Sequence, residues 1–151
     1  MNRRLILSMS VLVVAGMATV PSQAATKKKA PVKGTYAVNL VSDPTTEALN
    51  TAGKDGCVGL SPAGKDSHPF TVPGAGKLRV VLDGSDASSG KAFDWDLYLV
   101  DADGNTYSSS NGPTAHEETT DVFKKKMALT IQVCNLIGTP AGTVSYTFTY
   151  T

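Results

Sequence analysis

The sequence predicts an all-β fold, an antiparallel β-sandwich of about eight short strands. Two observations carry this prediction. Apolar and polar residues alternate over short stretches, and Gly, Pro, Asn and Asp residues separate those stretches. The stretches follow one another at intervals of about 8 to 15 residues, a spacing typical of sandwiches of the jelly-roll or immunoglobulin-like type. A chain of 151 residues has room for one such domain.

Residues 1–24 have the three parts of a cleavable secretory signal, expected to form a helix before removal. Arg3 and Arg4 supply positive charge, residues 5–20 form an uncharged apolar run, and small residues precede a cleavage point after Ala24. The run is shorter than the about 20 apolar residues of a membrane-spanning helix, which makes an uncleaved anchor the weaker alternative. We therefore expect a secreted, extracellular protein with no membrane span after signal cleavage.

Residues 25–45 are expected to form a flexible basic tail that leads into a short strand at Gly34–Val41. The charge of the whole chain is nearly balanced, with 14 Lys and Arg against 13 Asp and Glu. Because the signal and the tail hold several of the basic residues, the rest of the chain is mildly acidic. The tail suits contact with an anionic wall polymer or a lipid surface, and a solvated linker is the simpler alternative. The acidic body argues against nucleic-acid binding. The lysines of the tail are Lys27, Lys28, Lys29 and Lys33.

The β-sandwich domain is expected over residues 46–151. Its first part, up to residue 66, lacks periodicity and is expected to be mostly loop, with one helical turn at 47–50. In the strand at 93–100, Trp95 faces the core and Asp94 and Asp96 face the other side. Besides the strand of the tail region, strands are expected at 70–72, 78–82, 93–100, 106–110, 117–123, 127–133 and 144–150.

Cys57 and Cys134 are the only two cysteines, and an exported domain with one such pair is expected to form a disulfide. Cys134 alternates with Ile131 and Val133, so it lies on the opposite face of its strand from the core. The disulfide is therefore expected to fasten the loop around Cys57 to the outside or the rim of a sheet. Closing so long a loop stabilises the fold by about 4 kcal/mol in the chain-entropy model.

Three stretches, 70–80, 94–105 and 129–133 with 146–148, together resemble the bacterial pre-peptidase C-terminal domain family. The fingerprint is an aspartate-flanked Asp-Leu-Tyr-Leu strand, an Asp-x-x-Gly turn, a serine-rich return strand and a glutamate a few residues on. The resemblance covers about residues 66–151. It implies a secreted β-sandwich that is often appended to proteases and is itself non-catalytic. It leaves the ligand open, because one sandwich fold serves many tasks.

Calcium is the one cofactor that the sequence suggests. Some relatives in the resembled family bind calcium, and hard cations prefer clusters of oxygen ligands. Asp94 and Asp96 share one face of their strand and are expected to meet Asp86 from the loop at 84–90 at a calcium site. The turn after residue 100 does not match an EF-hand loop, because Gly104 stands at its fourth position rather than its sixth. The alternative is that Asp101 and Asp103 form the turn, while Asp94 and Asp96 face solvent on their strand.

Two further site hypotheses concern sugars and hydrolysis. Tyr98 and Tyr107 are expected to be exposed on neighbouring strands, where they form a stacking surface for a cell-wall polymer or polysaccharide. A small secreted hydrolase is the weaker alternative, because no Gly-x-Ser-x-Gly elbow occurs and His68 and His116 read as surface residues. We therefore expect a secreted, non-catalytic binding or accessory module whose partner is an extracellular protein or a cell-wall polymer.

Overall fold

A computed structural model describes residues 28–42, 57, 60–84 and 93–151. The signal at 1–24, the first part of the tail, the helical turn at 47–50 and the loop with Asp86 lie outside these residues. Within them the chain forms eight strands and one short 3-10 helix. They are β1 (Val32–Asn39), η2 (Pro62–Gly64), β2 (Lys65–Val72), β3 (Gly76–Gly84), β4 (Asp94–Asp101), β5 (Thr106–Ser110), β6 (His116–Phe123), β7 (Met127–Ile137) and β8 (Ala141–Tyr150).

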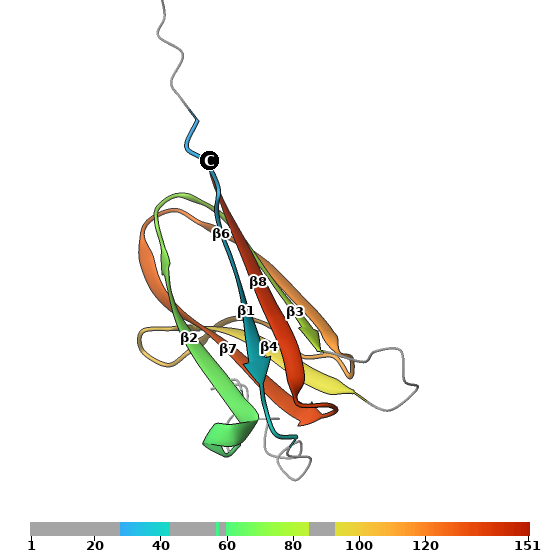
Figure 1. The fold of residues 1–151 in the computed structure, drawn as a ribbon. Coiled ribbons are helices and arrows are strands. Elements are labelled where there is room, and N and C mark those ends of the chain that lie inside the picture. The colour runs from blue at the N-terminus through green and yellow to red at the C-terminus, as the bar shows by residue number, and fades with distance from the viewer. Residues whose placement is uncertain (1–27, 43–56, 58–59, 85–92) are drawn as a thin grey trace, which may run out of the picture.

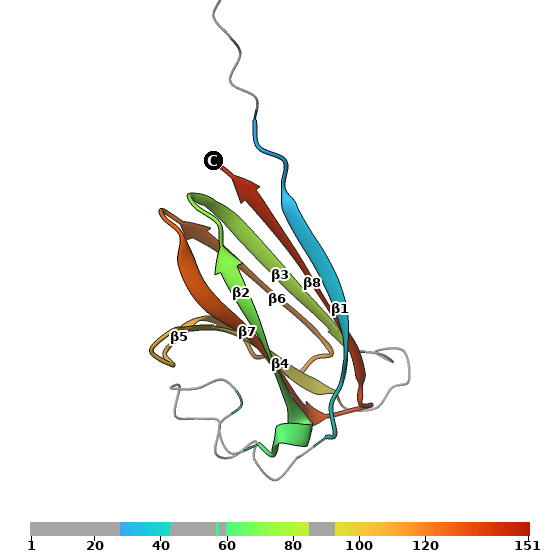
Figure 2. The ribbon, with the colours of Figure 1, turned by 60° about the vertical axis from the view of Figure 1, so that its left-hand side comes forward.

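The strands form two four-stranded sheets, which Figures 1 and 2 show packed face to face as a sandwich. One sheet has the order β1-β8-β3-β6 and the other has the order β2-β7-β4-β5, and all neighbours are antiparallel. The predicted fold class is therefore confirmed. Among the described residues, no helix has the length and apolar character needed to cross a bilayer.

The main core lies between the two sheets and is built from the apolar residues that alternate along the strands. Trp95 of β4 is fully buried in it, and the backbone comes close to its indole ring at Gly84 and Gly142. A Cβ atom at Gly84 would lie 2.9 Å from Trp95 Nε1, so this approach requires glycine.

A second apolar cluster lies on the outer face of the β2-β7-β4-β5 sheet, over β4 and the end of β7. The disulfide between Cys57 and Cys134 anchors it, with a Cα–Cα distance of 5.7 Å across a sequence separation of 77. This confirms the predicted pairing and its place outside the main core. Because both faces are covered, β4 is buried along its length up to its last residue. The cluster consists of Cys57, Leu60, Tyr98, Val100, Cys134 and Leu136.

Most strand boundaries differ from prediction by a few residues, and the differences in β1, β2 and β7 have a structural reason. β1 begins at Val32, pairs with β8 and belongs to the sandwich, although it was expected within the tail region. β2 begins at Lys65 because it pairs with the far end of β7. β7 runs beyond residue 133 because its last part is covered on both sides. There, fully buried Asn135 donates hydrogen bonds to the carbonyl oxygens of Leu40, at 2.9 Å, and Thr139, at 3.0 Å.

Candidate functional site

The predicted calcium ligands of β4 lie together, but they are buried. Asp94 and Asp96 share the outer face of β4, as the alternation predicts, and Asp96 is only 2% exposed. The Tyr98 hydroxyl donates a hydrogen bond of 3.0 Å to Asp96 Oδ2. Burial raises the pKa of Tyr98, and the negative charge of Asp96 raises it further. The Asp96 carboxylate is thus held inside the outer apolar cluster as a hydrogen-bond acceptor.

The described residues do not by themselves complete a metal site. No group of three or more His, Cys, Asp or Glu side chains in them could hold a metal ion. Calcium takes about six to eight oxygen ligands, more than Asp94 and Asp96 supply. The third predicted ligand, Asp86, lies outside the described residues, and calcium binding stays a prediction.

The structure corrects the expected exposure of Tyr98. Its side chain is 6% exposed, because it packs in the outer apolar cluster with Cys57, Leu60 and Leu136. Tyr107 is 42% exposed and stacks on Phe123, with ring centroids 5.1 Å apart. Tyr98 and Tyr107 therefore form no shared exposed surface in this structure. Only Tyr107 has the accessibility that stacking on a sugar ring requires.

A polar seam that the sequence reasoning missed lies where the edge strands β5 and β6 face each other. Its centre is Glu117, which is almost fully buried. Thr114 Oγ1 lies 2.7 Å from Glu117 Oε1, and the Ser110 hydroxyl donates to Glu117 Oε2. The sequence shows that both strands are rich in polar residues, but it does not show that they face each other. The seam is formed by Ser108, Ser110, Thr114, Glu117, Thr119 and Asp121.

The seam closes one side of the sandwich through hydroxyl–carboxylate hydrogen bonds. The Ser108 hydroxyl donates to Asp121 Oδ2 at 2.7 Å, and the Thr119 hydroxyl lies 3.0 Å from the same oxygen. Buried polar groups that hydrogen bond to one another avoid the cost of lost hydration. The serine-rich strand and the glutamate of the resembled fingerprint are therefore explained by the closure of this edge.

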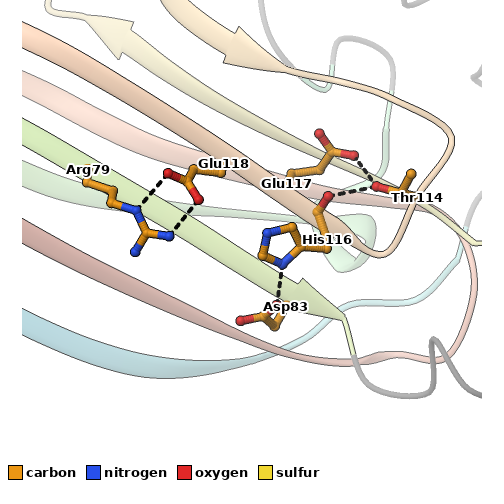
Figure 3. Close-up of polar contacts among 6 residues, drawn as sticks. All are labelled: Arg79, Asp83, Thr114, His116, Glu117 and Glu118. Carbon is orange, nitrogen blue, oxygen red and sulfur yellow. Dashed lines mark hydrogen bonds and ion pairs between the residues drawn. The ribbon is translucent and has the colours of Figure 1, made fainter.

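Two ion pairs cross from β3 to β6 on the outer face of the other sheet (Figure 3). Arg79 donates two hydrogen bonds of 2.6 Å to the carboxylate of Glu118, and the Nδ1 atom of His116 lies 2.6 Å from Asp83 Oδ1. The hydrogen bond from Arg79 lowers the pKa of Glu118. All four side chains are exposed to solvent, so these pairs contribute little to stability.

Neither histidine is placed as a catalytic base beside a serine among the described residues. His68 stacks on Tyr36 with ring centroids 4.3 Å apart, and His116 is paired with Asp83. In Figure 3, Glu117 points to the opposite side of β6 from the His116–Asp83 pair. The arrangement around the histidines is that of surface and edge packing.

A shallow cleft of ≈ 580 Å³ opens at one end of the sandwich. The tail, the turn between β2 and β3, and the end of β8 line it. Lys29 Nζ lies over the ring of Tyr150, 5.0 Å from its centroid, in a cation–π arrangement. The lining residues are Lys28, Lys29, Pro73, Gly74, Ala75, Tyr150 and Thr151.

Comparison with known proteins gives weak structural similarities only. No protein-family model and no curated protein matches the chain. The pre-peptidase C-terminal domain of a Bacillus anthracis collagenase matches with a TM-score of 0.40 and 13% identity, over 78% of this chain and 85% of that one. A Yersinia pseudotuberculosis-derived mitogen matches with a TM-score of 0.32 and 14% identity, over 58% and 86%.

The subviral particle protein VP2 of infectious bursal disease virus matches with a TM-score of 0.36 and 13% identity, over 90% of this chain and 37% of that one. Similarities of this size carry no argument about function. The class of the protein, a disulfide-fastened antiparallel β-sandwich, rests on its own sheets and registers.

Proposed function

We propose that this protein is a secreted, non-catalytic binding module of the pre-peptidase C-terminal type. One observation carries the proposal: the polar residues of the resembled fingerprint build the fold itself. Asp96 accepts a hydrogen bond from Tyr98, Asp101 Oδ1 accepts the backbone N–H groups of Asp103 and Asn105 at 2.9 Å, and Glu117 holds the seam. A fingerprint used for scaffolding leaves function to the exposed surface.

The proposal predicts export with an oxidised disulfide, and both are directly measurable. We expect the protein recovered from outside the cytoplasm to begin at Ala25 and to lack the two hydrogens removed by pairing Cys57 with Cys134. Intact-mass measurement before and after reduction checks both points. Recovery of a chain that begins at Met1, with both thiols free, would remove the export half of the proposal.

Catalysis is tested on the mature protein, residues 25–151, with fluorogenic peptide, ester and glycoside substrates. We expect no turnover above buffer, and the same background from the His68→Ala and His116→Ala variants. Turnover that disappears with His116→Ala and stays with His68→Ala would make the protein a hydrolase. That outcome would overturn the non-catalytic assignment.

Polysaccharide binding is a second candidate function, favoured by the exposed Tyr107 ring on β5. Its test is retention of the mature protein on insoluble cell-wall polysaccharide, with Tyr107→Ser compared against wild type. The alternation of β5 leaves Ser109 as a neighbouring exposed position, and Ser109→Ala is the matched control. Retention that is equal in all three proteins would count against Tyr107 as the contact.

A further inference from the structure

Lysines from three distant parts of the sequence meet at one end of the sandwich. Gly76, the first residue of β3, pairs with Phe123 of β6 and with Tyr150 of β8. The last residue of β2, Val72, pairs with Met127 at the start of β7. The tail, the β2–β3 turn and the β6–β7 turn therefore lie at the same end. Figures 1 and 2 both show the two turns side by side next to the C-terminus.

We call this the basic end. It carries seven described lysines, all exposed. Among the described residues, no ion pair involves any of them. The sequence alone separates the lysine runs at residues 27–33 and 124–126, so it does not reveal that they add up to one surface. The lysines are Lys28, Lys29, Lys33, Lys77, Lys124, Lys125 and Lys126.

Most of the described acidic residues lie toward the other end, but Asp101 of β4 pairs with Leu129 near the start of β7, so Asp101 and Asp103 lie toward the basic end. Asp83 pairs with His116 at the far end of β3, and Asp94 pairs in register with Ile137 at the far end of β7. Asp121 is the acidic residue of β6 nearest to the basic end, and its carboxylate is hydrogen bonded within the seam. The seven lysines outnumber the aspartates at this end, and this excess of positive charge favours a negatively charged partner.

Apolar and aromatic side chains lie among these lysines. Val122 is 66% exposed and stands directly opposite Lys77 in the β3–β6 register. Val32, at the start of β1, is also exposed. Tyr150 lies beneath Lys29 and lines the cleft of ≈ 580 Å³. Exposed valines gain nothing from a hydrated polyanion, whereas a lipid surface offers both negative headgroups and an apolar layer.

We propose that the basic end lies against the surface of an anionic phospholipid bilayer. The lysines meet the headgroups, Val122 and Val32 enter the boundary between headgroups and acyl chains, and the cleft beside Tyr150 receives one headgroup. The inference rests on the proposed function, since it supplies the secreted binding module with its partner.

The test is sedimentation of the mature protein with vesicles of one part phosphatidylglycerol to two parts phosphatidylcholine. We expect binding at low salt that weakens strongly at about 0.15 M, where screening acts within about 8 Å. Vesicles of phosphatidylcholine alone should bind far less. Each lysine removed from the surface should weaken binding about fivefold, so Lys124→Gln/Lys125→Gln/Lys126→Gln together should weaken it on the order of a hundredfold.

Two matched variants distinguish the effect of a lysine's position from the effect of the protein's net charge. Lys65→Gln removes the same charge as Lys125→Gln, but Lys65 pairs with Cys134 toward the opposite end of the molecule. We expect a loss for Lys125→Gln and little change for Lys65→Gln. Equal losses from both would indicate attraction by net charge alone and would overturn the basic end as the site. Thermal midpoints of the variants verify that each is folded.

Val122→Ser separates a lipid from a soluble polyanion. We expect it to weaken vesicle binding several-fold and to leave binding to inorganic polyphosphate unchanged. Tighter binding of polyphosphate than of vesicles, with no effect of Val122→Ser on either, would assign the basic end to an anionic polymer and reject the lipid. No vesicle binding at low salt would also reject it. Neither outcome touches the export and turnover tests of the proposed function.

Discussion

At the scale of single residues, removal of the Tyr98–Asp96 hydrogen bond tests whether these two side chains stabilise the fold. Tyr98→Phe removes the hydroxyl and leaves the buried Asp96 carboxylate without this donor. We expect the free energy of unfolding to fall by about 1–3 kcal/mol, the usual cost of losing a partner from a buried polar group. Urea denaturation measures it. Tyr107→Phe, at an exposed position, is the control and should change stability by less than about 0.5 kcal/mol.

The same burial predicts a loss of stability at high pH. Desolvation is the first cause of the raised pKa of both Tyr98 and Tyr36, and nearby Asp96 and Asp66 respectively add to it. A raised folded-state pKa means that the folded protein keeps its phenol protons when the unfolded chain has lost them. This contribution is fully present below pH about 10 and declines as pH rises above it.

We therefore expect the thermal midpoint to fall steeply above pH about 10, and to fall less steeply in Tyr98→Phe. Melting curves at a series of alkaline pH values check this expectation. A midpoint that is flat across that range would contradict the burial of the phenols.

Calcium binding is the next prediction at the residue scale, because it depends on the carboxylates of Asp94 and Asp96. At a concentration 100 times its dissociation constant, calcium should add about 2.7 kcal/mol to the free energy of unfolding. The prediction is a higher thermal midpoint in calcium than in excess chelator, absent in Asp94→Asn and Asp96→Asn. Asp103→Asn, in the β4–β5 turn, is the control. An equal midpoint in calcium and chelator would mean that Asp94 and Asp96 are structural acceptors only.

Sequence reasoning placed these residues correctly on β4 but misjudged their surroundings. Alternation alone puts Asp94, Asp96 and Tyr98 on one face, because successive side chains of a strand point to opposite sides. Tyr98 is buried in a cluster with Cys57 and Leu60, and Cys57 is 77 residues from its partner Cys134 in sequence. Alternation says nothing about what covers a face, so Tyr98 was expected to be exposed.

At the scale of elements, the start of β3 depends on a glycine. A Cβ atom at Gly76 would lie 2.4 Å from Phe148 Cζ and 2.4 Å from the carbonyl oxygen of Thr149 on β8. Because one of these atoms belongs to the backbone of a paired strand, Gly76→Ala must shift β8. We expect a loss of about 1–3 kcal/mol in the free energy of unfolding.

Gly74, in the turn just before β3, is the matched control. A Cβ atom there would meet nothing within 4 Å, and Gly74 does not have a positive φ angle. We expect Gly74→Ala to be neutral or to stabilise by up to about 1 kcal/mol, since alanine restricts the unfolded chain. Equal destabilisation by the two variants would contradict the close approach of β3 to β8.

The sequence predicts some strands better than others. Strands such as β3 and β8 are recognisable because one face packs on the core and the other meets solvent. The polar seam between β5 and β6 escaped prediction because two edge strands from different sheets form it. Only the folded topology brings Ser110 and Glu117 face to face.

At the scale of the whole molecule, the lysine distribution shows the same dependence on topology. Sequence reasoning treated the basic tail as a segment by itself and the body as acidic. The antiparallel registers bring Lys124–Lys126 to the end where the tail lies. Net charge is a property of composition, whereas a charged surface is a property of the fold.

The disulfide is a contact between two residues that affects the stability of the whole molecule, and its removal is the last prediction. Cys57→Ala/Cys134→Ala opens a loop with a sequence separation of 77, which should cost about 4 kcal/mol in the chain-entropy model. It should also loosen the outer apolar cluster over Tyr98 while the main core, which holds Trp95, stays packed. Burial is the main cause of the raised pKa of Tyr98, so in the variant this phenol should ionise closer to pH about 10.

Ultraviolet absorbance of tyrosinate during alkaline titration measures the change, with the Tyr98→Phe background identifying the signal of that residue. Trp95 fluorescence in the same samples reports whether the main core survives. A lower unfolding free energy with Tyr98 titrating as in the wild type would mean that the disulfide acts only on the unfolded chain. Earlier ionisation with unchanged Trp95 fluorescence would mean that it also holds the cover over β4, because only the outer cluster would then have opened.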